Sequence, residues 1–382
     1  MIDLETMSIL VVDDMKSMRL TIRKMLRNLN IGKMLRFAEN GKAGLEILKE
    51  TSCDLVIIDW NMPVMNGSKM LTQLRQDKAL RDMPVIMVTA ENERDIVSEV
   101  AEHEIDAYLL KPLTLAALDR KIKTVVENAN NPDECTLHIL KSRDLEEAGD
   151  IQGAIDQIRL ALFHKPSASR ILRKLALLHF KIDKTAIGVK CLQKAISVNK
   201  QDTISRHQLA RIYIQKKEYR NASKLFLEIL DLSTRYFGSA TRLGESMLKD
   251  GFRPEAIELF SKVVSKVRKN SSLKERIIDI CLEKREFRFV LSIIEHALKE
   301  NPSNYDLLFK AGMVYKEIKD YEKAMSCFRT IDSNKKGDPD AKLEIARIYQ
   351  HENRILQADD YVSQVLRIDP GNQKALALRQ EL

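Results

Sequence analysis

The 382-residue sequence lacks the features of a membrane protein and of a disulfide-rich protein. No apolar run approaches the roughly 18 residues that a membrane-spanning helix needs, and the N-terminus has no basic-then-apolar leader. The five cysteines are odd in number and form no CxxC pair, which argues against a disulfide framework or a zinc site. We therefore expect reduced thiols, a cytoplasmic location and no membrane insertion.

Aromatic residues are also scarce, at 5%, whereas charged residues reach 31% and hydrophobic residues 44%. This composition is typical of a helix-rich chain with enough apolar material for the cores of two or three domains. The net charge of +8 is uneven: residues 1–125 hold 18 Lys+Arg and 19 Asp+Glu, so the rest carries +9. A basic half of this kind suits nucleic acid, an acidic protein partner, or neither, and net charge alone does not choose.

The first 125 residues alternate short β-rich runs with amphipathic stretches that have helical spacing. The five runs are Ser8–Val12, Met34–Ala38, Leu55–Ile58, Val85–Val88 and Ala107–Leu110. Strands alternating with helices predict a parallel sheet covered on both faces. In such folds the active site lies at the carboxyl ends of the strands.

Chemically active residues follow four of these runs. The first run ends in Asp13-Asp14, the third in Asp59, the fourth in Thr89-Ala90-Glu91 and the fifth in Lys111-Pro112. Three carboxylates that converge on one site repel, at about 4 kcal/mol per pair for a 4 Å separation and an effective dielectric near 20. A cation must offset that repulsion, and Mg²⁺ prefers such oxygen ligands.

At these residues the chain resembles a response-regulator receiver domain, most closely the single-domain chemotaxis type, over nearly all of residues 7–125. The resemblance implies a flavodoxin-like, doubly wound five-stranded sheet. It also implies that Asp59 accepts a phosphoryl group from a histidine kinase or phosphotransfer protein. Asp14, Asp59 and the backbone carbonyl of Asn61 would ligate Mg²⁺, and Asp13 would act through water.

The resemblance assigns further roles around the phosphoacceptor. Lys111 would stabilise charge on the transferring group, and the peptide bond between Lys111 and Pro112 would be cis. The Thr89 hydroxyl would bind a phosphoryl oxygen and let Tyr108 turn inward as a switch. Asn61 and Glu91 would tune hydrolysis of the acyl phosphate. The chain is then no enzyme beyond its own phosphorylation and autohydrolysis. One departure from the family is Glu104-Ile105-Asp106, where small residues are usual, and it could alter the output face.

Beyond residue 132 the strand pattern gives way to a gapless 34-residue repeat. One column of small residues reads Ala154, Gly188, Ala222, Ala256, Val290, Ala324 and Ala358. A bulky column four positions later reads Ile158, Leu192, Phe226, Phe260, Ile294, Phe328 and Val362. These columns resemble the tetratricopeptide repeat (TPR) family, which implies an all-α right-handed superhelix of fourteen antiparallel helices. The alternative is an unrelated helical bundle with chance periodicity. Repeat 1 departs from the pattern at Lys141 and Ser142.

The two resemblances together divide the chain. We expect a receiver domain over residues 1–127, a short linker over 128–134, seven TPR-like repeats over 135–372 and a C-terminal capping helix over 373–382. Because the linker is short and contains no long Gly/Ser stretch, the relative orientation of the two domains should be restricted.

In repeats of this kind the first helix of each pair lines a concave groove that binds a peptide or helix. Carried onto this register, the groove would present Arg170, Arg173, Lys181, His207, Arg211, Glu275, Asp279 and Glu283. A basic entrance and an acidic stretch suit a partner of mixed charge.

The sequence therefore predicts a two-component response regulator whose phosphorylation modulates protein–protein interactions of the repeats. The rival interpretation is a receiver-controlled regulator that binds RNA or DNA through the basic half. The absence of a helix-turn-helix signature and of aromatic RNA-binding motifs argues against nucleic acid. After residue 130 the sequence contains no nucleophile–base set and no Gly-rich phosphate loop, so nothing there indicates a separate catalytic output. Self-association into a homodimer stays open.

Overall fold

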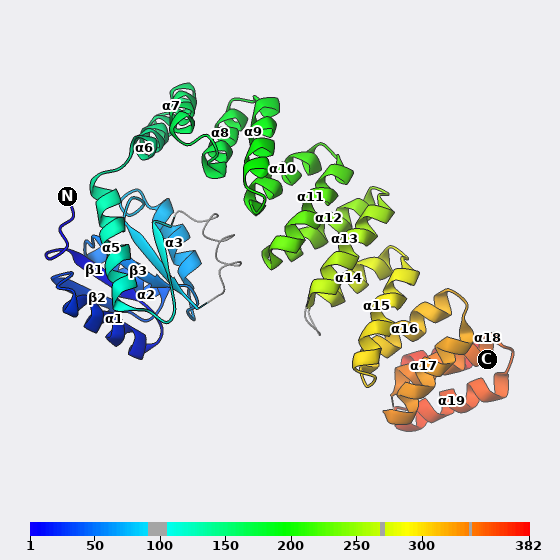
Figure 1. Ribbon diagram of the computed structural model, residues 1–382. Helices are drawn as coiled ribbons and strands as arrows, with labels where there is room; N and C mark the ends of the chain where they lie inside the picture. Colours follow the sequence, from blue (N-terminus) through cyan, green and yellow to red (C-terminus); the bar gives the residue numbers. More distant parts are fainter. Residues whose placement is uncertain (91–104, 268–271, 336–337) are drawn as a thin grey trace. The chain divides into compact units, whose positions relative to one another are not determined.

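The computed structural model describes residues 1–90, 105–267, 272–335 and 338–382, in two compact units (Figure 1). The first unit, Met1–Ser233, contains a sheet followed by three helical pairs, and the second, Thr234–Leu382, is helical throughout its described residues. Among the described helices none is long and apolar enough to cross a bilayer. All five cysteines are free.

The sheet has five parallel strands in the order β2-β1-β3-β4-β5. The strands are β1 (Ser8–Val12), β2 (Met34–Ala38), β3 (Leu55–Asp59), β4 (Val85–Thr89) and β5 (Ala107–Leu110). The described helices of this part are α1 (Lys16–Asn28), α2 (Gly41–Glu50), α3 (Gly67–Gln76) and α5 (Leu115–Asn130). The predicted doubly wound, flavodoxin-like sheet is confirmed, and the observed strands match the five predicted runs to within one residue.

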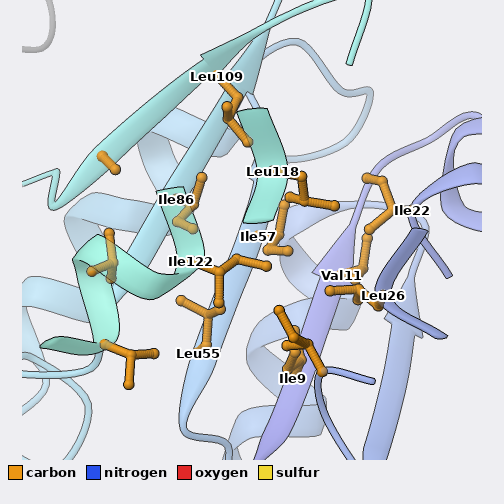
Figure 2. Close-up of a cluster of buried hydrophobic side chains, with 14 of the residues drawn as sticks. Ile9, Val11, Ile22, Leu26, Leu55, Ile57, Ile86, Leu109, Leu118 and Ile122 are labelled. Carbon is orange, nitrogen blue, oxygen red and sulfur yellow. The ribbon is translucent and has the colours of Figure 1, made fainter. Parts of the chain in front are cut away.

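Two apolar cores lie on the two faces of this sheet because successive strand side chains point to opposite sides. On one face Ile9, Val11 and Ile57 pack against α1 and α5 (Figure 2). On the other face Leu10 and Val12 pack against α2 and α3. Since both faces are covered, β3 and β4 are buried along their whole length. Polar side chains therefore gather at the strand ends and beyond them.

The rest of the chain consists of helical pairs, with no strand among its described residues. In the first unit these are α6 (Glu134–Glu147), α7 (Ile151–His164), α8 (Ser169–Lys181), α9 (Thr185–Val198), α10 (Thr203–Gln215) and α11 (Tyr219–Leu232). The second unit begins with a 3-10 turn, η1 (Thr234–Tyr236), and continues with α12 (Phe237–Lys249), α13 (Arg253–Lys266), α14 (Ser272–Glu283), α15 (Phe287–Glu300), α16 (Tyr305–Glu317), α17 (Tyr321–Asn334), α18 (Pro339–His351), α19 (Ile355–Ile368) and α20 (Gln373–Glu381). An all-α array thus follows the sheet, as the periodicity predicts.

The 34-residue columns correspond to packing positions between the helices of a pair. Every small-column residue is buried, and every bulky-column side chain is at most 1% exposed. Gly312 shows why one position must be small, because a Cβ there would come within 2.7 Å of the Phe328 ring. In repeat 1 the unusual Ser142 is fully buried and donates a hydrogen bond of 2.9 Å to the Ala154 carbonyl. Its hydroxyl is therefore satisfied at the helix–helix contact.

The turn inside each pair also repeats every 34 residues, in the backbone. A left-handed residue ends the first helix at Gly149, Asp183, Lys217, Gly251, Arg285, Lys319 and Asn353, with φ between 57° and 88°. The next N–H then bonds back to the carbonyl five residues earlier, as from Glu218 to Tyr213 at 2.8 Å. This is the Schellman motif, which satisfies carbonyls that the helix end leaves unpaired.

The connection between the sheet domain and the repeats is three residues long, since α5 ends at Asn130 and α6 begins at Glu134. The last turn of α5 is attached to the start of the chain by the Asn130 side chain. Its amide donates to the Ile2 carbonyl at 2.8 Å and accepts from the Ile2 N–H at 2.6 Å. Helix α5 thus extends three residues beyond the predicted domain boundary at residue 127 and remains part of the sheet domain's packing.

Candidate phosphoacceptor site

The acidic residues converge because parallel strands end at the same edge of the sheet. Asp13 follows β1, while Asp59 and Thr89 are the last residues of β3 and β4. These three side chains are buried, with Asp13 1% exposed, Asp59 5% and Thr89 3%. A buried carboxylate must be paired or hydrogen-bonded, so the neighbours of Asp13 and Asp59 decide what the site can do.

Lys111 supplies the positive charge at this edge. It follows β5 directly, and its peptide bond to Pro112 is cis, as predicted. Its ammonium nitrogen lies 2.6 Å from Oδ1 of Asp59 and 3.1 Å from Oδ2 of Asp13. One largely buried ammonium therefore serves two buried carboxylates.

Lys111 does not fully offset the cost of burying the Asp59 charge, so the pKa of Asp59 is raised. Burial raises the pKa of Asp59 above its ordinary value, Lys111 lowers it, and the charges of Asp13 and Asp14 raise it further, with a net increase. Burial lowers the pKa of Lys111, but hydrogen bonds and charge from Asp59 and Asp13 outweigh that effect and raise it overall. Lys111 is thus held as a cation, while Asp59 has an excess of negative charge around it.

The other predicted receiver residues lie around this centre. Asp14 is exposed, although its charge acts on Asp59, and Asn61 is exposed on the loop after β3. Tyr108 on β5 is half-buried, with the Lys121 ammonium 5.6 Å from its ring centroid. Glu91 lies outside the described residues.

Two residues that the sequence analysis did not single out shape the site. Arg19 of α1 donates hydrogen bonds to the carbonyls of Asp13 and Asp14, at 2.6 and 3.0 Å, and holds the acidic loop. Gly67 begins α3 directly against Asp59, where a Cβ would collide with the Asp59 carbonyl. The Asn-Gly pair before an amphipathic run is a signal for Gly67, but no sequence pattern pointed to Arg19.

The charges of this site suit a divalent cation. Asp13 and Asp59 share the Lys111 ammonium, and the charge of Asp14 also acts on Asp59, so carboxylates outnumber ammonium groups around Asp59. Across the described part of the chain, no three His, Cys, Asp or Glu side chains form a metal site by themselves. Mg²⁺ does not require such a cage, because it commonly combines one or two carboxylates with waters and phosphate oxygens. The residues present therefore fit Mg²⁺.

The predicted groove residues have varied surroundings. In the first unit Arg173 is buried against Asp202 at 2.8 Å, and Lys181 pairs with Glu146 at 2.8 Å. His207 is half-buried, with its ring edge-on to Phe226 at 5.7 Å, whereas Arg170 and Arg211 are exposed.

The acidic set belongs to the second unit. Asp279 pairs with Lys310 at 2.6 Å, and Glu283 with Lys284 at 2.8 Å. Glu275 is exposed. Several charges predicted for a partner are therefore engaged within the array.

Comparison with known proteins supports both the receiver resemblance of the N-terminal part and the TPR resemblance of the helical part. The family model described as "Response regulator receiver domain" matches residues 9–123, and the one described as "Tetratricopeptide repeat" matches 205–236 and 305–335. A chemotaxis protein CheY of Pseudomonas aeruginosa is 39% identical over 124 residues, 32% of this chain and 99% of the relative. Chemotaxis protein CheY-3 of Vibrio cholerae is 37% identical over 123 residues, 32% of this chain and 94% of the relative.

Among solved structures, YrrB, described as "a TPR protein with an unusual peptide-binding site", is 19% identical with a TM-score of 0.33, over 50% of this chain and 99% of that one. The receiver match covers almost the whole length of the chemotaxis proteins, and both repeat matches lie inside the segment that shows the 34-residue repeat. The chain therefore belongs to the response-regulator family, as a chemotaxis-type receiver domain fused to tetratricopeptide repeats.

Proposed function

We propose that the protein is a phosphorylation-controlled interaction scaffold, in which Asp59 is the phosphoacceptor and the repeats bind a protein partner. The observation that carries the proposal is the buried Asp59 carboxylate at the end of β3, with the Lys111 ammonium 2.6 Å away and Asp13 beside it. The receiver family supports a histidine kinase or phosphotransfer protein as donor.

In this proposal an Asp59 oxygen attacks the donor's phosphorus. An acyl phosphate forms while the donor's phosphorus–nitrogen bond breaks, and the imidazole leaves with the bonding electrons and takes up a proton. Mg²⁺, when bound by Asp14, Asp59 and the Asn61 carbonyl, supplies positive charge to the phosphoryl oxygens. Asp13 acts through water. Lys111, which already lies at the Asp59 carboxylate, stabilises the charge on the same group.

The signal then passes through the ends of β4 and β5. Thr89 is buried at the end of β4, where its hydroxyl would donate to a phosphoryl oxygen. Tyr108 is half-buried and would turn further inward as the Thr89 loop moves. Asn61 and Glu91 would set how fast water hydrolyses the acyl phosphate. The repeats would respond through predicted groove residues such as the exposed Arg211, with a peptide or helix as partner.

Phosphoryl labelling tests the receiver part. Incubated with a small-molecule phosphodonor and Mg²⁺, the protein should gain one acid-stable, base-labile phosphoryl group. Asp59→Asn should abolish the labelling because the amide is a poor nucleophile and removes a ligand charge. Thr89→Ala is the matched control, since it should still accept phosphate. Labelling that persists in Asp59→Asn, or that needs no divalent ion, contradicts the assignment.

Affinity capture tests the repeat part. Wild type with a stable phosphoryl mimic should differ from Asp59→Asn in partner affinity by roughly 5- to 150-fold, the usual range of allosteric coupling. Thr89→Ala should weaken this difference. Equal affinity in both states would mean that the receiver does not control the repeats.

A further inference from the structure

The receiver contacts the first helical pair through charged side chains. On the receiver these are Lys78, Arg81 and Asp82, in the segment between α3 and β4. On α6 they are Arg143, Asp144 and Glu147, within little more than one helical turn. We refer to these six residues as the α3–β4/α6 interface.

Opposite charges face each other across this interface. Arg143 donates through its two terminal guanidinium nitrogens to the two Asp82 carboxylate oxygens, with Nη2 3.0 Å from Oδ2. Arg81 pairs with Glu147 and lies 3.8 Å from Asp144. Lys78 adds a pair to Glu147 at 3.4 Å. A bidentate Arg–carboxylate pair within a network is the geometry in which surface ion pairs contribute to specificity and stability.

The receiver side of the interface is held in place by Arg75 of α3. Its guanidinium donates to the carbonyls of Arg81 and Met83 at 3.0 and 2.8 Å, and to the Asp106 carboxylate at 2.9 Å. Asp106 also accepts from the Val85 N–H at 2.8 Å. The segment is therefore joined to α3, to the first residue of β4 and to Asp106, the residue that precedes β5.

Asp106 is one of the residues at which the sequence departs from its family. Burial raises the pKa of Asp106, and the charges of Arg75 and, to a smaller extent, Arg170 on α8 lower it.

The position of the interface separates it from the phosphoacceptor. Asp82 precedes the first residue of β4, whereas Thr89 is the last residue of that strand. Parallel strands share their direction, so the interface lies at the amino end of the sheet and Asp59 at the carboxyl end. Contacts to α6 therefore leave the Asp59 edge open to a phosphodonor.

We propose that the α3–β4/α6 interface docks the receiver onto the first repeat through the edge of the sheet opposite Asp59. The three-residue connection after α5 limits the distance between the domains, and the ion pairs fix their orientation. This inference does not depend on phosphorylation, since it concerns the resting protein.

Charge reversal in the full chain, without phosphodonor, tests the docking. Arg143→Asp places like charges opposite Asp82, so hydrogen exchange at residues 77–84 should accelerate by roughly 5- to 30-fold, the factor that one or two kcal/mol produces. The swapped pair Asp82→Arg with Arg143→Asp should restore slow exchange. The matched control is Arg159→Asp on α7, where Arg159 lies 3.5 Å from Asp156 on its own helix. It should leave residues 77–84 unchanged.

The rescue distinguishes docking from a local effect on α6. If Arg143→Asp leaves exchange at residues 77–84 unchanged, or if the swapped pair exchanges as fast as the single variant, the interface does not dock the receiver. Both results are independent of Asp59 labelling, so failure here and failure of the proposed phosphorylation are distinguishable.

Discussion

The receiver and the repeats use buried charge in opposite ways. In the receiver, two buried carboxylates share one ammonium, and the pKa of Asp59 is raised, first by burial. In the repeats, buried carboxylates lie against enough positive charge to match them, as in Asp202 with Arg173 and in Glu344 with both Lys316 and Arg347. Uncompensated buried charge is expected at a site that binds a ligand or a chemical group, whereas matched buried charge is expected where the ion pair has only a structural role. The contrast therefore supports the proposed chemistry in the receiver and a structural role for the buried ion pairs of the array.

The matched charges of the array also explain part of its basic composition. Lys174 and Lys181 of α8 both pair with Glu146 of α6, and Lys316 of α16 pairs with Glu344 of α18. These pairs connect neighbouring repeats. Part of the positive charge that could suggest nucleic acid is therefore used between helices.

The largest expected effect comes from breaking a matched pair in the array. Asp202 is 3% exposed, caps α10 by accepting from the Ser205 N–H, and pairs with the buried Arg173. Asp202→Ala removes the carboxylate that lies 2.8 Å from that buried guanidinium and also removes the cap, so the free energy of unfolding should fall by about 3–5 kcal/mol. Urea denaturation followed by circular dichroism measures the change.

An exposed inter-repeat pair provides the control for this prediction. Asp340 pairs with Lys374 at 3.0 Å while both side chains are mostly exposed. Asp340→Ala should therefore cost only about 0–1 kcal/mol, as surface pairs do. Equal losses in the two variants would mean that burial does not distinguish these ion pairs.

The second prediction concerns the under-compensated receiver site. Because the folded protein raises the pKa of Asp59, the native state retains its proton to higher pH than the unfolded chain. Stability is therefore lost as pH rises from the unfolded value near 4 through the folded pKa, and it stays lost at neutral pH. Asp59→Asn removes this cost, while Lys111 keeps Asp13 as a partner at 3.1 Å.

Without divalent cations, the melting temperature of Asp59→Asn should thus exceed that of wild type at pH 7, and the difference should shrink on acidification below about pH 4. Lys111→Met is the opposite control, since it removes the shared cation and should destabilise at pH 7. A wild type that melts above Asp59→Asn at neutral pH would show that Asp59 is fully compensated.

The smallest expected effect lies in the turns of the array. Gly251 has φ +87°, and a Cβ added there would meet no atom within 4 Å, so Gly251→Ala costs backbone strain alone, about 1–2 kcal/mol. Lys217 occupies the same turn position with φ 58°. Lys217→Gly relieves that strain but adds entropy to the unfolded chain, so a net gain of about 0.5–1 kcal/mol is expected. If urea denaturation shows that the free energy of unfolding falls in Gly251→Ala and rises in Lys217→Gly, the two turns are equivalent. Changes of the same sign in both variants would contradict this.

Much of the receiver was predictable because its signals are local. Asp59 and Lys111 each end or directly follow a short apolar run, and the alternation of strands with helices predicts a parallel sheet whose carboxyl strand ends lie together. Arg19 was not predictable, since an arginine on an amphipathic helix usually faces solvent and only the folded loop brings two carbonyls to it. The left-handed turns were equally hidden, because only two of the seven positions hold glycine.

The sequence by itself determined the order of the elements, the strand ends at which acid residues gather and the 34-residue period of the helices. These follow from hydrophobic spacing, which acts over a few residues. Tertiary structure alone decided that Lys111 is shared by Asp13 and Asp59, that Arg173 is buried by Asp202, and that α6 meets the segment before β4. Each of these depends on charges far apart in the chain, and the pairing of distant charges leaves no periodic pattern in the sequence.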